Sequence, residues 1–339
     1  MAANYVDLSR IKYYVTAFFG NGEQIQLESL CENIAWEDNE KELAVRLNLT
    51  IRDAEYKGGR LAQKFALGTV MYLYADWGEG KQEIFRGTVW EWSHSGINND
   101  AITLTCYDML YYLQKSTGNK YFAKGKKTKA VIKSILDSWK VELGEYSGPN
   151  VEHKKLVYKA KTISQMLTTT LEKAEDLGGE KAIIRANQGK CDIIARGAND
   201  VVYNFTAGTN LITSDDKYSM TELITRIKIT GKDNKNGIPK IEATVDGHTE
   251  FGILQSFQSM GSGSLKDAKK KAQKTLKDKG EPKHTTTFSA PDFPLIRKGM
   301  KIHVETDLLV SDYIIKGVSH NATNGTMQMD VEPAKEDDE

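Results

Sequence analysis

The chain has 339 residues, of which 40% are hydrophobic and 27% are charged, and this composition is typical of a globular protein with two or three domains. Its 46 basic residues balance 46 acidic ones, which argues against specific nucleic-acid binding, because that function needs a net basic surface. The N-terminus does not resemble a signal peptide, and no run of about 18 apolar residues occurs, so we expect neither secretion nor membrane insertion.

The sequence lacks the common motifs of catalysis and cofactor binding. It has no P-loop, dinucleotide fingerprint, zinc-protease motif or nucleophile elbow, and its six histidines are not paired at ligand spacing. Cys31, Cys106 and Cys191 are too far apart for a disulfide framework or a zinc site. Glu172 and Asp176 suit a solvated helix face better than a glycosidase pair, whose carboxyls come from facing elements. We therefore expect no catalytic residue, no cofactor and no metal.

The first region, residues 1–107, is predicted to be a small antiparallel β-barrel domain. Its clearest strand is 43–52, where apolar residues at odd positions alternate with polar residues at even ones. Further strands are expected at 69–75, 84–94 and 101–106, with lead-in segments at 25–30 and 33–36.

The middle region, residues 108–200, is predicted to be an α+β unit. We expect a helix over 108–115, a second helix capped by Thr128, and a third from Ser164 to the glycines at 178–179. Trp139 and Leu177 are assigned to the apolar faces of the second and third helices. Strands at 182–186 and 191–196 are predicted to form a hairpin around 187–189.

The last region, residues 201–333, is predicted to be a second β-barrel domain with an inserted lysine-rich helix over 264–280, followed by an acidic tail at 334–339. The expected fold class is mixed and β-rich (α+β), with two small antiparallel β-barrel domains flanking a central helix-plus-hairpin α+β unit. Strands are expected at 223–230, 241–245, 251–257, 285–289, 300–305, 313–320 and 327–331.

The C-terminal part carries a pattern of motifs in a fixed order. The lysine-rich helix is followed by a strand, then by Leu295-Ile-Arg-Lys-Gly299, then by Tyr313-Ile-Ile-Lys-Gly-Val-Ser-His320, and then by a strand after Asn324-Gly325. This order resembles the tail hub proteins of PBSX-type defective prophages (the XkdQ/YqbQ family), which are relatives of late control protein D and of the central hub of contractile phage baseplates. The resemblance covers most of the chain from Asp108 onward and is weaker in the first region.

The resemblance implies a structural subunit rather than an enzyme. Such hubs form homotrimeric rings in which two similar barrels per chain imitate six-fold symmetry, so that the ring joins a six-fold tail tube to a three-fold central spike. The implied partners are the central spike, the tail tube, the tape-measure protein and a baseplate wedge or LysM-containing baseplate protein. The implied location is the bacterial cytoplasm first, and then the assembled virion, prophage particle or R-type bacteriocin.

Candidate contact residues follow from this interpretation. For the subunit interface we expect residues on exposed strand faces, namely Tyr72, Tyr74, Trp90, Ile302 and Val304. For an outward contact with a sheath-proximal or wedge protein we expect the lysine-rich helix, with Lys266, Lys270, Lys274 and Lys277. A simpler explanation of these lysines is a solvated outer face.

Two alternative functions remain open at the level of sequence. One is a tail-associated cell-wall hydrolase, which peptidoglycan digestion would reveal. The other is a carbohydrate- or surface-binding β module that uses Trp77 and Trp90, in which case glycan binding would disappear in Trp77→Ala.

Overall fold

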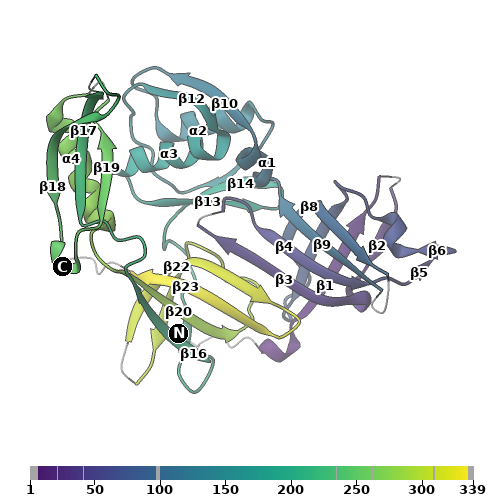
Figure 1. The fold of residues 1–339 in the computed structure, drawn as a ribbon. Coiled ribbons are helices and arrows are strands. Elements are labelled where there is room, and N and C mark those ends of the chain that lie inside the picture. The colour runs from purple at the N-terminus through teal and green to yellow at the C-terminus, as the bar shows by residue number, and fades with distance from the viewer. Residues whose placement is uncertain are drawn as a thin grey trace. The chain divides into compact units, whose positions relative to one another are not determined.

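The protein is represented by a computed structural model that describes residues 7–20, 22–40, 42–96, 100–233, 235–261, 263–307 and 310–334. Of the expected acidic tail, 335–339 lie outside the described residues. The chain forms two compact units, one of Met1–Ser214 with Thr287–Glu339 and one of Asp215–Thr286 (Figure 1). Strands dominate the described elements, so the predicted mixed, β-rich fold class is confirmed.

The first strand module is a curled antiparallel sheet. Within the described residues its ladder runs β3-β4-β9-β8-β7-β1-β2, and no ladder joins β2 to β3. Val15 of β1, Leu49 of β4 and Leu104 of β9 share one core, so strands far apart in the ladder enclose the same interior. The described ladders thus form a curled sheet and do not by themselves close the small antiparallel β-barrel that the sequence predicts. Its strands are β1 (Lys12–Phe18), β2 (Gln24–Gln26), β3 (Cys31–Asn39), β4 (Arg46–Arg52), β7 (Val70–Asp76), β8 (Gln82–Ser95) and β9 (Ala101–Asp108).

The first strand module also contains a short hairpin and three 3-10 turns. A small hairpin, β5 (Glu55–Tyr56) with β6 (Gly59–Arg60), lies between β4 and β7 in the chain. Three 3-10 turns accompany it: η1 (Leu8–Arg10), η2 (Glu28–Leu30) and η3 (Leu61–Lys64).

The middle region is an α+β unit with its own apolar core. The predicted hairpin is present, and Gln188 and Gly189 both have positive φ, as a tight type I′ turn requires. Two details differ from prediction: Lys127, and not Thr128, is the N-cap of α2, and Trp139 and Leu177 are exposed. The elements are α1 (Leu110–Lys115), β10 (Thr117–Phe122), α2 (Thr128–Asp137), β11 (Leu143–Tyr146), β12 (Leu156–Thr162), α3 (Ile163–Glu175), β13 (Ala182–Asn187) and β14 (Lys190–Ala195).

The second strand module follows the ladder β16-β20-β23-β22-β21-β15. Its two end strands, β15 and β16, are neighbours in the chain, and the short connection at 207–212 therefore links the two ends of the ladder. The bounds are β15 (Tyr203–Thr206), β16 (Thr213–Ser219), β20 (Lys283–Pro291), β21 (Lys301–Glu305), β22 (Val310–Asn321) and β23 (Thr326–Pro333). The far end of β22 also pairs with β3, with His320 opposite Trp36, so both modules belong to one continuous sheet.

The unit Asp215–Thr286 contains a separate three-stranded sheet covered on one face by a helix, drawn in green in Figure 1. The sequence had assigned these three strands to the second barrel. Ile227 and Ile229 of the sheet pack against Ala268, Ala272 and Leu276 of the helix. The elements are β17 (Arg226–Asp233), β18 (Pro239–Asp246), η4 (Thr249–Phe251), β19 (Gln255–Ser259) and α4 (Leu265–Lys279).

Candidate assembly interface

The outer side of the first module carries a row of aromatic side chains. Alternation along β1 and β7 buries Val15, Ala17, Met71 and Leu73, and it turns the residues between them outward. The outward set includes Tyr14, Phe18, Tyr72 and Tyr74, which we call the aromatic face. All four side chains are half-buried, so each ring packs partly against the module and remains partly accessible to solvent.

The rings of the aromatic face contact one another directly. Tyr72 and Tyr74 are stacked with centroids 5.8 Å apart and planes 4° apart, and Phe18 meets Tyr72 edge-on at 5.0 Å. Cross-strand pairing sets these distances, because Tyr14 lies opposite Tyr74 and Thr16 lies opposite Tyr72. The arrangement fixes the rings before any partner binds.

Two cations lie over this face. The Nζ of Lys81 is 3.7 Å from the ring centroid of Tyr14, and the guanidinium of Arg86 is 4.9 Å from that of Tyr72. Arg86 is held by two hydrogen bonds to Glu83, of 3.2 Å and 2.7 Å, which raise the pKa of the guanidinium. Burial, with Glu83 nearby, raises the pKa of Tyr74 as well, so the phenol stays neutral. A surface of aromatic rings with one fixed arginine is typical of protein–protein contacts.

Of the other three residues expected at the interface, two are buried and Trp90 is partly exposed. Ile302 and Val304 are fully buried in the core of the second module, so the expectation that they lie outside is wrong. The apolar side of β21 faces inward, and its polar side, with His303, faces outward. Trp90 packs edge-on against Tyr111 of the middle unit at 4.7 Å and is only partly exposed.

The lysine-rich helix is present with the predicted bounds. Ser264 accepts a hydrogen bond from the amide of Asp267 and caps α4, whose first residue is Leu265 and whose last is Lys279. The four candidate lysines, Lys266, Lys270, Lys274 and Lys277, are all exposed. The helix carries seven lysines against two aspartates, so its outer side is strongly basic.

A buried lysine joins three parts of the larger unit. Lys298 is nearly inaccessible to solvent, and its Nζ lies 3.0 Å from the carboxylate of Asp38 at the end of β3. Burial alone would raise the pKa of Asp38, but Lys298 and Arg297 hold it well below its usual range. The same ammonium donates to the backbone carbonyls of Asn39, Glu42 and Leu43 at 3.1–3.2 Å.

Arg297 completes this junction. Its Nε donates to Asp38 at 2.9 Å, and its Nη1 donates to the carbonyl of Ala186 in the middle-unit hairpin at 3.0 Å. Gly299 follows with φ +81°, and a Cβ there would lie 2.2 Å from Ile183. The Arg-Lys-Gly sequence that marked the family motif therefore clamps the second module to β3 and to the middle unit. The motif is visible in the sequence, but no local pattern there indicates what these side chains contact.

A second buried group lies under the β22–β3 junction. The Nδ1 of His320 is 2.6 Å from Asp292, its Nε2 is 3.0 Å from the carbonyl of Ile296, and its ring stacks on Trp36. Tyr13 of β1 donates a hydrogen bond to the same carboxylate. Asp292 thus bonds to both His320 and Tyr13, and His320 and Asp292 are both buried. The group is structural.

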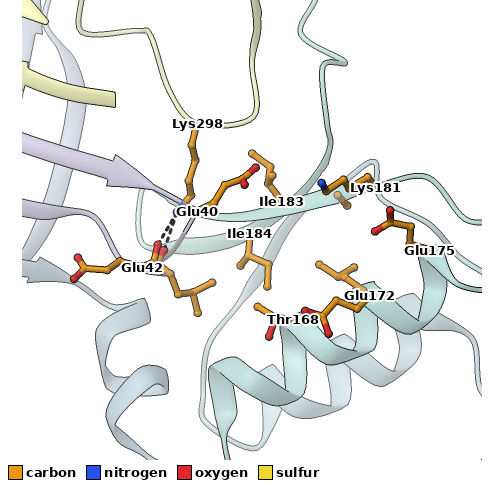
Figure 2. A pocket seen from close by; sticks show the side chains of 12 residues that line it. Glu40, Glu42, Thr168, Glu172, Glu175, Lys181, Ile183, Ile184 and Lys298 are labelled. Atoms are coloured by element: carbon orange, nitrogen blue, oxygen red, sulfur yellow. Dashed lines mark hydrogen bonds between the residues drawn. The ribbon is translucent and has the colours of Figure 1, made fainter. Parts of the chain in front are cut away.

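One cavity of about 200 Å³ opens beside α3 and β13 (Figure 2). Leu43, Leu171 and Ile184 form its apolar floor, while Glu172 and Glu175 lie exposed on its helix side. None of the lining residues is a serine, cysteine, histidine or tyrosine, and Thr168 donates its hydroxyl to helix carbonyls. The cavity therefore offers no nucleophile paired with a base.

Two general features bear on the site. Within the described residues, no group of three or more His, Cys, Asp or Glu side chains could hold a metal ion. The helices of that same part of the chain are too short or too polar to cross a bilayer.

The model of the YQBQ-like family matches residues 34–332. The chain belongs to the YQBQ-like family. The match covers the β22–β3 junction, the middle unit and the Arg297–Gly299 turn, and it confirms the relationship that the C-terminal motifs predicted. No curated protein matches the sequence.

Solved structures show the same fold at low sequence identity. A tail protein from Neisseria meningitidis is 15% identical, with a TM-score of 0.64 over 95% of this chain and 97% of its own. The 43 kDa tail protein of prophage MuSo2 from Shewanella oneidensis is 13% identical, with a TM-score of 0.66 over 94% and 97%. The E. coli c3393 protein, a type VI secretion component similar to the T4 tail proteins gp27 and gp5, is 9% identical, with a TM-score of 0.53 over 90% and 74%. This YQBQ-like protein thus has the fold of phage tail proteins.

Proposed function

We propose that this protein is a structural hub subunit of a contractile phage-tail-like injection particle. Three copies form a ring whose six strand modules match the tail tube on one side and the three-fold central spike on the other. Full-length similarity to tail proteins from two bacteria, together with the YQBQ-like family match, carries this proposal. The ring closes by heterologous contacts, in which one surface of a copy meets a different surface of the next.

The aromatic face supports the copy-to-copy contact. Tyr72 and Tyr74 are ordered by stacking and by Arg86, so a neighbouring subunit can cover them with little loss of side-chain freedom. Ile302 and Val304 do not contribute to this contact, because each is buried within its own chain.

The Lys298 junction supports mechanical coupling within each subunit. A buried ammonium with one carboxylate and three carbonyl partners is costly to separate, so β3, the middle unit and the second module respond together to a load. This rigidity suits a part that transmits force between tube and spike.

We further propose the same partners and location that the resemblance implied. The spike, tube and tape-measure proteins bind the ring, and a wedge or LysM-containing protein binds the lysines of α4. The chain is made in the bacterial cytoplasm and ends in the particle. No nucleic acid is recognised by sequence, and the subunit is not an enzyme.

The two alternatives have less support. A hydrolase needs an activated nucleophile or two carboxylates free to act across a cleft. The cavity in Figure 2 is lined by Glu172 and Glu175 of α3 and, from the segment after β3, by Glu40 and Glu42, and Glu40 is held in an ion pair with Arg196 at 2.9 Å. A glycan platform needs exposed rings, but Trp77 is 6% exposed and packs on Phe293 in the core.

Cryo-electron microscopy of the assembled particle tests the proposal. We expect three copies in one ring between tube and spike, whereas six copies, or a place away from the tube end, would contradict it. Incubation of the purified protein with peptidoglycan should release no soluble fragments, and release that follows the protein through purification would favour the hydrolase.

A further inference from the structure

The sheet of the unit Asp215–Thr286 has one unprotected edge. Within the described residues its order is β18-β17-β19, so β19 pairs on one side only. The opposite edge strand, β18, carries Pro239 and Lys240, which discourage pairing with another strand. In contrast, β19 reads Gln255-Ser-Phe-Gln-Ser259 and has neither a proline nor a charge.

The exposed side of β19 carries a large apolar residue. Phe257 is 62% exposed, which is unusual for a phenylalanine in a strand. Gln258 donates its side-chain amide to the carbonyl of Ala268 in α4, so Gln258 faces the helix and its neighbour Phe257 faces the other side. An added strand could therefore place apolar side chains against Phe257.

The helix side of the same edge is basic. Helix α4 packs against β17, and its seven lysines outnumber its two aspartates. The hydrogen bond from Gln258 to Ala268 brings the first turns of α4 beside β19, and Lys266, Lys269 and Lys270 belong to these turns. Acidic residues on the helix side of a strand added along β19 would be favoured, and basic ones would be repelled.

We propose that this unit binds an extended, acidic segment of a neighbouring tail protein, which adds to the sheet as a fourth strand along β19. Main-chain hydrogen bonds to the open edge of β19 supply binding energy. Alternate side chains of the added strand contact Phe257 on one face of the sheet and the lysines of α4 on the other. The inference rests on the proposed function and deepens it, because it names the chemistry of the partner that contacts α4.

Photo-crosslinking in the assembled particle tests the inference. Phe257 is replaced by benzoylphenylalanine in the full-length chain, the chain is produced with the other tail proteins, and the crosslinked peptide is sequenced by mass spectrometry after irradiation. We expect a peptide of another tail protein with net negative charge and alternating apolar and acidic residues. A basic peptide, a peptide from a second copy of this chain, or no crosslinked protein overturns the inference.

Charge reversal supplies a matched control. Replacement of Lys266, Lys270, Lys274 and Lys277 by glutamate should lower the yield of the crosslink by about tenfold, since exposed opposite charges become repulsive. The same change at Lys124, Lys126, Lys154 and Lys155, which are exposed lysines outside the unit Asp215–Thr286, should leave the yield within about twofold, because these residues belong neither to β19 nor to α4. Equal losses in both variants would show that general charge, and not a contact at α4, controls the yield.

The amount of the chain in purified particles is measured in parallel by immunoblot. Particles that contain the chain but yield no acidic crosslink refute the strand addition and leave the hub function intact. Absence of the wild-type chain from the particles refutes the hub function itself.

Discussion

His153 is a buried histidine, and its protonation would destabilise the folded chain. Its Nε2 is 3.0 Å from Thr128 Oγ1, and the threonine hydroxyl donates to the carbonyl of Val151, so Nε2 carries the hydrogen. The buried Nδ1 has no hydrogen-bond partner, and burial, with a smaller effect of Lys173, lowers the pKa of the ring. A charge on this ring would therefore be unsolvated.

This geometry predicts an acid-sensitive middle unit. The unfolded chain binds a proton at His153 below a pH of about 6.5, while the folded chain resists it, so the free energy of unfolding falls as pH drops through that value. His153→Gln should lose this part of the pH dependence. Denaturant unfolding at pH 7.5 and 5.5 measures the difference. Identical slopes for His153→Gln and the wild type would contradict the prediction.

Gly299 is required both by its backbone and by its neighbour. Its φ of +81° disfavours any side chain, and a Cβ would overlap Ile183 at 2.2 Å. Gly299→Ala should cost roughly 2–4 kcal/mol, combining strain and overlap. Gly325→Ala is a matched control, because Gly325 also has positive φ but has nothing within 4 Å, so it should lose only about 1 kcal/mol. Adding Ile183→Ala to Gly299→Ala should recover part of the loss in chemical denaturation, and no recovery would exclude the overlap.

At the scale of elements, the Arg297–Gly299 turn depends on its buried charge. Lys298→Met leaves Asp38 with one cation and three carbonyls without their donor, so we expect a loss of about 3–5 kcal/mol in the free energy of unfolding. Lys301→Met removes a partly exposed lysine whose Nζ lies 4.0 Å from Asp312, and it should cost at most about 1 kcal/mol. If Lys298→Met and Lys301→Met lose the same stability in thermal unfolding, the buried ion pair stabilises the fold no more than the exposed one does.

Elements that carry their own stop and start signals could be predicted from sequence, and elements that depend on pairing could not. Helix α4 has a serine cap, an apolar stripe and a terminal glycine, and its predicted bounds are confirmed. Strand β1 was missed because aromatic residues occupy both of its faces, which hides the alternation. Strand β16 was missed because nearly all of its residues are exposed, so that pairing with β20 alone makes it a strand.

The candidate interface was only partly predictable for a related reason. An alternating strand shows that it has an apolar face, but the pattern does not say whether that face meets the chain's own core or another subunit. For β21 the apolar face is the core, and Ile302 and Val304 were therefore misplaced. For β7 both faces are apolar, and the structure turns Met71 and Leu73 inward, so that Tyr72 and Tyr74 lie on the outer side, as the sequence predicts. The Lys298 junction joins residues some 260 positions apart, which no local pattern reveals.

At the scale of the whole molecule, the continuous sheet decides how a ring can form. The first and second modules are joined through β22 and β3, so in the proposed ring each copy would contribute two modules that share one sheet. The aromatic face lies on β1 and β7 of the first module, away from that junction in the ladder. It is therefore free to contact the next copy without disturbing the pairing inside its own chain.

The pair Tyr72→Glu and Tyr74→Glu tests this contact. Burying two carboxylates between subunits costs far more than exposing them on a monomer, so the double variant should fold with near wild-type stability yet enter particles at least about tenfold less often. Tyr121→Glu is the control, because Tyr121 is 66% exposed on β10 outside the aromatic face, and it should be incorporated normally. Quantitative mass spectrometry of purified particles measures incorporation, and circular dichroism of the free chains checks folding. A folded double variant that is incorporated like the wild type would place the contact between copies on another surface.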